Sequence, residues 1–329
     1  MTQFAGAARI LWRLLESKGI DPVPIYAQAG IDAAVLHGQR ARIGVDQMDQ
    51  VWTQVTALLG DDCIALEMPE FWRPGDFQAL DHAWLASTTL EGALSVLVRY
   101  LEVVDQSGRL RLVRSPRGTA LCGMHPRLGL KDHAMFREGV VAVFVHMARL
   151  IAGPDLVPLE VTFRGPAPSC AGRYAPWFGC PVQFSAPNDC VLFDQRDLTR
   201  PLSAQADVGV VIERVLFKEV ARLRACEGIA GRVQALLADA MPSGKVGLGD
   251  IAAFLTISPF ELKRRLRREG TSYRAELDAV RRAFASQYLS DSSLSLIEIA
   301  FLLGFSEQSA FSRACRRWFD AAPSELRKR

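Results

Sequence analysis

Two stretches near the C-terminal end decide how this chain folds: DIAAFLTISPFELKRRLRREG at residues 250–270 and EIAFLLGFSEQSAFSRACRRW at residues 298–318. The second is a near-repeat of the first at an offset of 48 residues. Each begins with a short apolar segment, passes through a turn at residues 256–258 or 304–306, and continues as a second segment with helical spacing. Short helix, tight turn and second helix form the helix-turn-helix pattern. The sequence therefore predicts two such units within the last 85 residues.

The second helix of each unit has an apolar face and a polar face. The apolar faces are formed by Leu262 and Leu266 in the first unit and by Phe311, Ala314, Cys315 and Trp318 in the second. The opposite faces carry side-chain types that read base edges in the major groove of DNA. These predicted base-reading residues are Phe260, Lys263, Arg264, Gln308, Ser309, Ser312 and Arg313. The neighbouring arginines suit DNA phosphates, and they are Arg267, Arg268, Arg316 and Arg317.

An amphipathic helix with a solvated polar face gives the same pattern in either unit alone, but its repetition favours DNA binding. The joining segment, residues 273–289, supports this interpretation. Its apolar positions recur at steps of three or four, at Tyr273, Leu277, Val280, Phe284 and Tyr288. A single helix can therefore pack on both units and hold the two reading helices at a fixed separation, as successive major grooves require.

Charge is distributed unevenly along the chain. Residues 245–329 contain 15 Lys and Arg and 10 Asp and Glu, a net charge of +5. The remaining residues contain 24 basic and 26 acidic side chains, a net charge of −2. A basic segment beside a mildly acidic one indicates that the C-terminal part faces nucleic acid.

Residues 1–205 have a different pattern, with helical segments first and then short strands. Alternating residues predict strands at 109–115, 119–125 and 159–165 and two more between 181 and 195, with a helix over 132–151. Another helix follows a hydroxyl N-cap at Ser87 or Thr88, with Glu91 three or four positions later. The predicted fold class is thus a mixed α+β domain over residues 1–205, followed by an all-α DNA-binding domain with two helix-turn-helix units over residues 226–329.

Residues 206–225 lie between the two regions and are predicted to form one helix. Its apolar stripe consists of Val208, Val211, Ile212, Val215 and Leu216. The stripe fits a linker or dimerisation helix, and it fits equally well a helix that packs on its own domain.

The C-terminal stretches resemble the DNA-binding domain of AraC/XylS-type transcriptional regulators over about the last hundred residues. The resemblance is carried by Ile299-Ala300, Gly304-Phe305-Ser306, Ala310-Phe311-Ser312-Arg313, Arg317-Trp318 and Pro323. It implies base contacts for Phe260, Lys263, Arg264, Gln308, Ser309 and Arg313. Two departures are Cys315, where the family usually has Phe, and Asp320, where it usually has Gly.

The N-terminal region resembles the arabinose-binding-type domain found in one branch of these regulators. Three stretches carry this resemblance: FWRPGDF at 71–77, ASTTLEGAL at 86–94 and RYL at 99–101. It implies an effector-sensing and dimerising role for residues 1–205 and does not identify the effector-binding residues. Trp52, Phe71, Trp72, Trp84 and Tyr100 suit a pocket, although aromatic residues at helical spacing more often form a core.

The sequence gives no indication of an enzyme. It lacks the nucleophile-elbow, P-loop, dinucleotide-binding and zinc-protease motifs, and its five histidines are scattered. The seven dispersed cysteines match no zinc pattern and are expected to be reduced thiols. We therefore expect no catalytic residues, no metal and no cofactor. No apolar stretch approaches 18 residues and no signal peptide is evident, so we expect a cytoplasmic protein without a membrane partner.

The predicted function is that of a sequence-specific, dimeric, effector-responsive activator of transcription. Its expected partners are double-stranded DNA at promoter or operator sites, a second copy of the chain and an unidentified small molecule, with RNA polymerase as a further candidate. Two alternatives stay open: a DNA-binding module controlled by a protein partner, and an enzyme with a DNA-docking tail.

Overall fold

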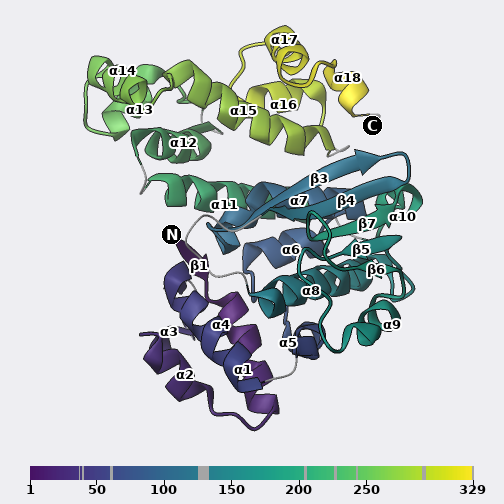
Figure 1. The fold of residues 1–329 in the computed structure, drawn as a ribbon. Coiled ribbons are helices and arrows are strands. Elements are labelled where there is room, and N and C mark those ends of the chain that lie inside the picture. Colours follow the sequence, from purple (N-terminus) through teal and green to yellow (C-terminus); the bar gives the residue numbers. More distant parts are fainter. Residues whose placement is uncertain are drawn as a thin grey trace. The chain divides into compact units, whose positions relative to one another are not determined.

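The computed structural model describes residues 1–36, 38, 41–59, 62–124, 133–203, 206–225, 228–241, 244–290 and 294–327. The chain divides into two compact units, Met1–Gln205 and Ala206–Arg329, here called the N-terminal and C-terminal units (Figure 1). The first is a mixed α/β unit and the second is helical in its described residues, which confirms the predicted fold class.

A five-stranded sheet organises one half of the N-terminal unit. Its strands are β3 (Arg109–Ser115), β4 (Gly118–Met124), β5 (Glu160–Thr162), β6 (Val182–Gln183) and β7 (Cys190–Asp194). Their order is β3-β4-β7-β5-β6, and every neighbouring pair is antiparallel except β5 and β6. The accompanying helices are α5 (Met68–Phe71), α6 (Ala79–Leu85), α7 (Leu90–Val104), α8 (Ala134–Ala152), α9 (Tyr174–Phe178) and α10 (Gln195–Thr199). Two 3-10 turns span Asp62–Glu67 and Ala171–Arg173.

A smaller helical lobe precedes the sheet (Figure 1). It contains α1 (Gly6–Ser17), α2 (Pro22–Gln28), α3 (Ala33–Leu36) and α4 (Val45–Leu59). The short strands β1 (Thr2–Phe4) and β2 (Arg42–Gly44) pair antiparallel beside them. Asp21 starts α2 as expected of an Asp-Pro pair, because its side chain accepts a hydrogen bond from the Val23 amide at 3.0 Å.

Two sequence-based expectations about the N-terminal unit are wrong. The N-cap of α7 is Thr89, whose hydroxyl accepts from the Gly92 amide at 3.0 Å, rather than residue 87 or 88. Ser87 instead donates to the Ala83 carbonyl of the preceding helix. The cysteines are also not all reduced, because Cys63–Cys170 and Cys122–Cys190 form disulfides. Folding brings these pairs together across 107 and 68 residues, so no local spacing reveals them.

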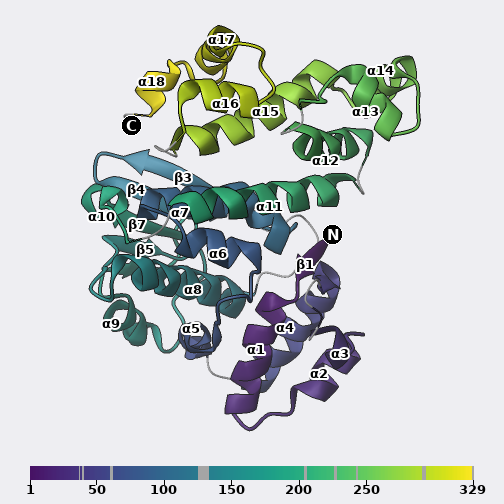
Figure 2. The same cartoon turned by 180° about the vertical axis from the view of Figure 1, so that it is seen from behind.

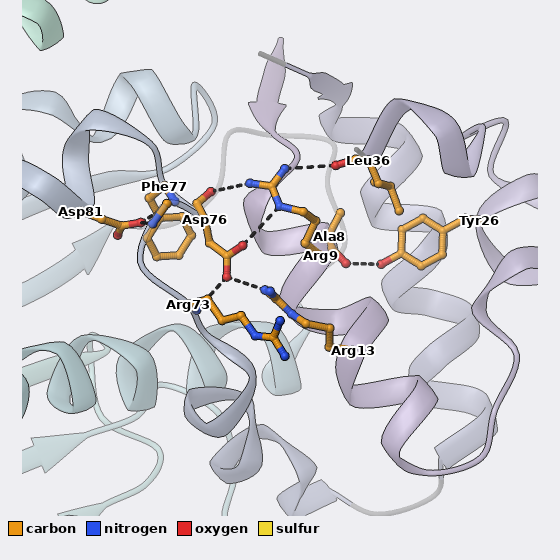
Figure 3. Close-up of polar contacts among 10 residues, drawn as sticks. Ala8, Arg9, Arg13, Tyr26, Leu36, Arg73, Asp76, Phe77 and Asp81 are labelled. Atoms are coloured by element: carbon orange, nitrogen blue, oxygen red, sulfur yellow. Dashed lines mark hydrogen bonds and ion pairs between the residues drawn. The ribbon is translucent and has the colours of Figure 1, made fainter. Parts of the chain in front are cut away.

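One buried carboxylate helps to tie the helical lobe to the rest of the unit. Asp76, 4% exposed, accepts hydrogen bonds from Arg9 at 3.2 Å, from Arg13 and from the Arg73 amide at 2.9 Å (Figure 3). We call these four residues the Asp76 cluster. Gly6 permits the contact, because a Cβ there would lie 1.7 Å from the Asp76 carbonyl oxygen.

A second buried carboxylate, that of Asp81, lies in α6, five residues after Asp76. Asp81 is fully buried and accepts hydrogen bonds from the amides of Gly75 at 2.9 Å and Phe77 at 2.8 Å. Its other oxygen has no hydrogen-bond partner among the described residues. Burial raises the pKa of Asp81 to about 7, although the two backbone hydrogen bonds act in the opposite direction.

The C-terminal unit is a set of helices around α15. They are α11 (Ala206–Ala225), α12 (Ile229–Ala240), α13 (Leu248–Phe254), α14 (Pro259–Arg268), α15 (Tyr273–Ser290), α16 (Leu296–Leu302), α17 (Gln308–Phe319) and α18 (Pro323–Leu326). Figures 1 and 2 show α13 and α14 at one end of α15 and α16, α17 and α18 at the other. Val280, Phe284 and Tyr288 of α15 are buried in the common core, which confirms the predicted apolar face of the joining helix; its role in spacing the two reading helices stays a prediction.

Helix α11 packs within the C-terminal unit, against α12 and α15. The rings of Phe217 and Phe284 lie 4.8 Å apart between centroids, and Lys218 pairs with Asp239 at 2.6 Å. The end of α11 that carries these residues is therefore part of the helical core.

Candidate nucleic-acid interface

The first helix-turn-helix is α13, a turn and α14. Thr256 in the turn has a φ of 56°, a left-handed conformation that β-branched residues rarely adopt. Ser258 then caps α14 by accepting a hydrogen bond from the Glu261 amide at 3.1 Å, and Pro259 occupies the first helical position. The turn directs α14 away from α13, with Leu262 and Leu266 fully buried beneath it.

The second helix-turn-helix is α16, a turn and α17. Ser295 and Glu298 form a capping box at the start of α16, and the hydrogen bonds from Ser295 lower the pKa of Glu298. Gly304, 48 positions after Thr256, occupies the equivalent place in the turn with a φ of 68°. The repeat seen in the sequence is thus also a repeat of backbone conformation.

Arg281 of α15 holds the second turn in place. Its guanidinium donates to the carbonyls of Leu303 at 2.9 Å and Gly304 at 2.7 Å, and lies 4.2 Å from the centroid of the Phe305 ring. Sequence reasoning missed this residue, because nothing in the local pattern shows that α15 reaches the end of α16.

The outward face of α14 is exposed. Phe260 is 78% exposed, and Lys263, Arg264, Arg267 and Arg268 are also exposed. An exposed aromatic ring beside cationic side chains suits a DNA-reading face, because the ring can contact a thymine methyl while the cations bond to base edges. The assignment of these residues to bases and phosphates stays a prediction.

A carboxylate on α14 partly neutralises this face. Glu261 contacts Arg264 at 2.8 Å and Arg265 at 2.7 Å. The hydrogen bonds from Arg264 and then Arg265 lower the pKa of Glu261 to about 2. The same contact raises the pKa of Arg264. The sequence carries a signal for these pairs, since Glu precedes the two arginines by three and four positions.

Helix α17 separates its residues in the predicted way. Its four predicted apolar residues are buried: Phe311, Ala314, Cys315 and Trp318. Ser309, Arg313, Arg316 and Arg317 are exposed, while Gln308 and Ser312 are half-buried. The structure therefore brings the predicted residues of each reading helix onto one face, and their contacts with DNA stay a prediction.

Two arginines of α17 already have acidic neighbours. Arg313 lies 3.3 Å from Glu307, which also accepts a hydrogen bond from Ser309. The bonds from Ser309 and Arg313 lower the pKa of Glu307. Arg317 pairs with Asp278 of α15 at 2.9 Å, a tertiary contact that the sequence does not indicate.

The two departures from the family pattern have structural consequences. Asp320 ends α17 in a left-handed conformation with a φ of 54°, where Gly is unstrained. Cys315 is fully buried, and burial raises the pKa of its thiol to about 12. Both residues serve the structure of the helix and lie off its outward face.

No described helix has the length and apolar character needed to cross a membrane.

Comparison with known proteins agrees with this architecture. Residues 19–202 match the family model described as the arabinose-binding domain of AraC transcription regulators, and residues 251–329 match a helix-turn-helix domain. The ornithine utilization regulator of Pseudomonas aeruginosa is 30% identical over 98% of this chain and 95% of its own length. The transcriptional regulator VirS of Mycobacterium tuberculosis is 28% identical over 95% of this chain and 93% of its own length.

Among solved structures, the transcriptional regulator CdpR of Pseudomonas aeruginosa covers 97% of this chain and 98% of its own, at 19% identity and a TM-score of 0.47. By name, the first of these two relatives is a regulator and the second is a helix-turn-helix transcriptional regulator. With two family models covering both units and a full-length relative, this chain belongs to the AraC family of DNA-binding transcription regulators.

Proposed function

We propose that the chain binds specific sites in double-stranded DNA through α14 and α17, as a cytoplasmic homodimer that activates transcription in response to a small molecule. One observation carries the DNA-binding part. The outward faces of both second helices expose the side chains that suit DNA, in two units of matching backbone conformation. RNA polymerase is the expected partner of an activator bound at a promoter.

Within this proposal the outward-facing residues divide into two groups. The base-reading group is Phe260, Lys263, Arg264, Gln308, Ser309, Ser312 and Arg313. The phosphate group is Arg267, Arg268, Arg316 and Arg317. Base contacts determine preference among sequences, whereas phosphate contacts strengthen binding to every sequence and make it sensitive to salt.

This division is tested by site selection and salt titration on the intact chain. Arg313→Ala should weaken the best site roughly 5- to 100-fold and relax preference at a few base pairs. Arg268→Ala should weaken all sequences alike and reduce the slope of log K against log salt by about 1. Arg232→Ala on α12 is the matched control, an exposed arginine outside both reading helices. An unchanged selected motif for Arg313→Ala would show that the assigned face of α17 is wrong.

The exposed stripe of α11 supports the dimer. Val208, Val211 and Val215 are 44%, 60% and 47% exposed and share one face of the helix. Three exposed valines on one face form an apolar strip that a second copy would cover.

Sedimentation of the intact chain tests the dimer and its interface. At tens of micromolar we expect a dimer that Val211→Asp dissociates. Val23→Asp, at a 48% exposed valine on α2, should leave the dimer unchanged. A monomeric parent chain would contradict the dimer, and a dimeric Val211→Asp variant would place the interface elsewhere.

A further inference from the structure

A partly open cavity of about 200 Å³ lies within the N-terminal unit. Its lining residues come from both parts of that unit: from β1, α1 and α4 in the helical lobe, and from α7, α8 and the sheet in the rest. Its lining is mostly apolar and includes Ile10, Met48, Trp52, Leu97, Val140 and Phe144. Of the five aromatic residues that suited a pocket by sequence, Trp52 alone lines it, while Trp72, Trp84 and Tyr100 are buried in the core.

Most charged groups that line the cavity already have partners. His133 lies 2.8 Å from Asp49, and Arg137 lies 2.7 Å from Asp189. Asp105 accepts hydrogen bonds from the amide and hydroxyl of Ser107 at 2.7 and 2.6 Å. These acidic groups are therefore poorly placed to bind a cationic ligand.

Two lining side chains keep unused hydrogen-bond donors. Gln3 of β1 is only 5% exposed, and its amide nitrogen has no hydrogen-bond partner among the described residues. Leaving a buried amide unpaired is costly, so a ligand oxygen beside it would be favoured. Arg109 is exposed, donates to the carbonyls of Gln106 at 3.1 Å and Gly108 at 2.7 Å, and forms no ion pair with a described carboxylate, so its guanidinium can receive a carboxylate from the solvent side.

These two donors belong to the same end of the cavity. Gln3 forms a β-bridge with Asp105, and the chain from Asp105 leads in four residues to Arg109 at the start of β3. An amide and a guanidinium that both lack an anionic partner make this the acceptor-binding end, and the remaining walls are hydrocarbon and aromatic.

We infer that this cavity binds a hydrophobic monocarboxylate, with the carboxylate at Arg109 and Gln3 and the apolar body between α4, α7 and α8. A cavity of 150 Å³ holds benzene, so this one suits an apolar body of roughly eight non-hydrogen atoms. A sugar does not suit it, because most of its hydroxyl groups would meet apolar walls. The inference rests on the proposed effector response and names its chemical class and site.

The Asp76 cluster gives this site a defined shape. Phe4, Ala7 and Ile10 line the cavity from β1 and α1, and Phe77 lines it from the segment beyond Asp76. Arg9 and Arg13 hold α1 against that segment through Asp76 (Figure 3). The walls are therefore fixed before a ligand enters, which lowers the cost of binding.

Calorimetry and thermal unfolding of the intact chain test the inference with octanoate and 3-phenylpropionate as probes. Both acids should bind and raise the melting temperature, while 1-octanol and L-arabinose should bind far more weakly. Arg109→Gln should weaken the acids roughly 10- to 100-fold. Arg111→Gln, an exposed arginine on the same strand that does not line the cavity, should leave binding unchanged.

Gln3→Leu should also weaken the acids, and its melting temperature without ligand shows whether it folds. Equal binding of octanoate and 1-octanol, or an Arg109→Gln variant that binds like the parent, would overturn the inference. The inference would also be overturned if neither acid bound. DNA binding measured on the same samples distinguishes failure of this site from failure of the DNA-binding proposal. If the chain binds DNA with sequence preference but binds no carboxylate, the cavity site is rejected and the DNA-binding proposal stands.

Discussion

At the scale of single residues, the arginines expected to read bases are paired with carboxylates on the same face. Arg264 contacts Glu261 and Arg313 contacts Glu307, and all four side chains lie at the protein surface. Each carboxylate contacts its arginine and also repels phosphates. DNA bound as proposed must therefore compete with Glu261 and Glu307 for the two guanidinium groups.

Removing one of these carboxylates should strengthen DNA binding and weaken discrimination. Glu307 is the better choice, because its side chain does not cap α17. We expect Glu307→Gln to raise affinity for non-specific DNA roughly two- to fivefold at low salt, with a smaller gain for the preferred site. Fluorescence anisotropy with both DNAs measures the two affinities. Asp239→Asn removes an exposed paired carboxylate from α12 and serves as the control; an equal gain from it would mean that net charge alone is responsible.

Asp81 should make the stability of the N-terminal unit depend on pH. Its pKa of about 7 in the folded chain lies above the ordinary value of 3.8, so the folded state keeps a proton that the unfolded chain has lost. The contribution of Asp81 to the free energy of unfolding is therefore fully present below about pH 4. It falls as pH rises towards 7, by up to about 1.4 kcal/mol per pH unit.

Asp81→Asn should remove this pH dependence, because an amide can accept the bonds from Gly75 and Phe77 without ionising. Urea unfolding between pH 5 and 8, followed by tryptophan emission, is the measurement. Five of the six tryptophans belong to the N-terminal unit, so emission reports mainly on it. A variant with the same slope as the parent would assign the pH dependence to other groups.

At the scale of elements, the two turns offer a matched pair of substitutions. Thr256 adopts a left-handed conformation that costs a β-branched residue about 1–2 kcal/mol, partly offset by the greater chain entropy of glycine. Thr256→Gly should therefore stabilise the C-terminal unit by about 0.5–1 kcal/mol. Gly304→Ala should destabilise it by about 1–2 kcal/mol, because its φ is 68° and the new Cβ would lie 3.2 Å from Val246. Chemical denaturation checks both signs, and the same sign for the two changes would contradict the equivalence of the turns.

The elements that could be predicted from the sequence are those with local causes. Ser258, Pro259 and the spacing of Leu262 and Leu266 are enough to define α14, because capping and periodicity act within a few residues. Period-two alternation likewise located β3. The outward faces of α14 and α17 followed from the same periodicity, which explains why the candidate DNA-binding residues were accessible to sequence reasoning.

Features that depend on distant contacts were not predictable. The disulfide between Cys122 and Cys190 depends on the register of β4 against β7. The contact of Arg281 with the second turn depends on the packing of α15. The cavity depends on how α1 and α4 meet the sheet, so Gln3 and Arg109 gave no signal as isolated residues. A single sequence contains too little information on long-range pairing to reveal any of these.

At the scale of the whole molecule, α11 determines where the C-terminal unit begins. Phe217 packs on Phe284 of the core, and Lys218 pairs with Asp239. A fragment of residues 206–329 should therefore unfold at a higher temperature than one of residues 228–329, with a difference of roughly 2–4 kcal/mol in stability from the lost aromatic packing. Calorimetry of the two fragments measures this difference. Identical unfolding curves would mean that α11 adds nothing to the fold.

The near-repeat of α13–α14 in α16–α17 also has a consequence for the geometry of a promoter. The two reading helices match in backbone but not in their predicted base-reading side chains: α14 offers an aromatic ring and two cations, whereas α17 offers an amide, two hydroxyls and one guanidinium. Base pairs that suit one helix do not suit the other. A site read by one chain then has a head and a tail, and cutting it out and reinserting it backwards would preserve every base pair while pointing the bound protein away from the gene.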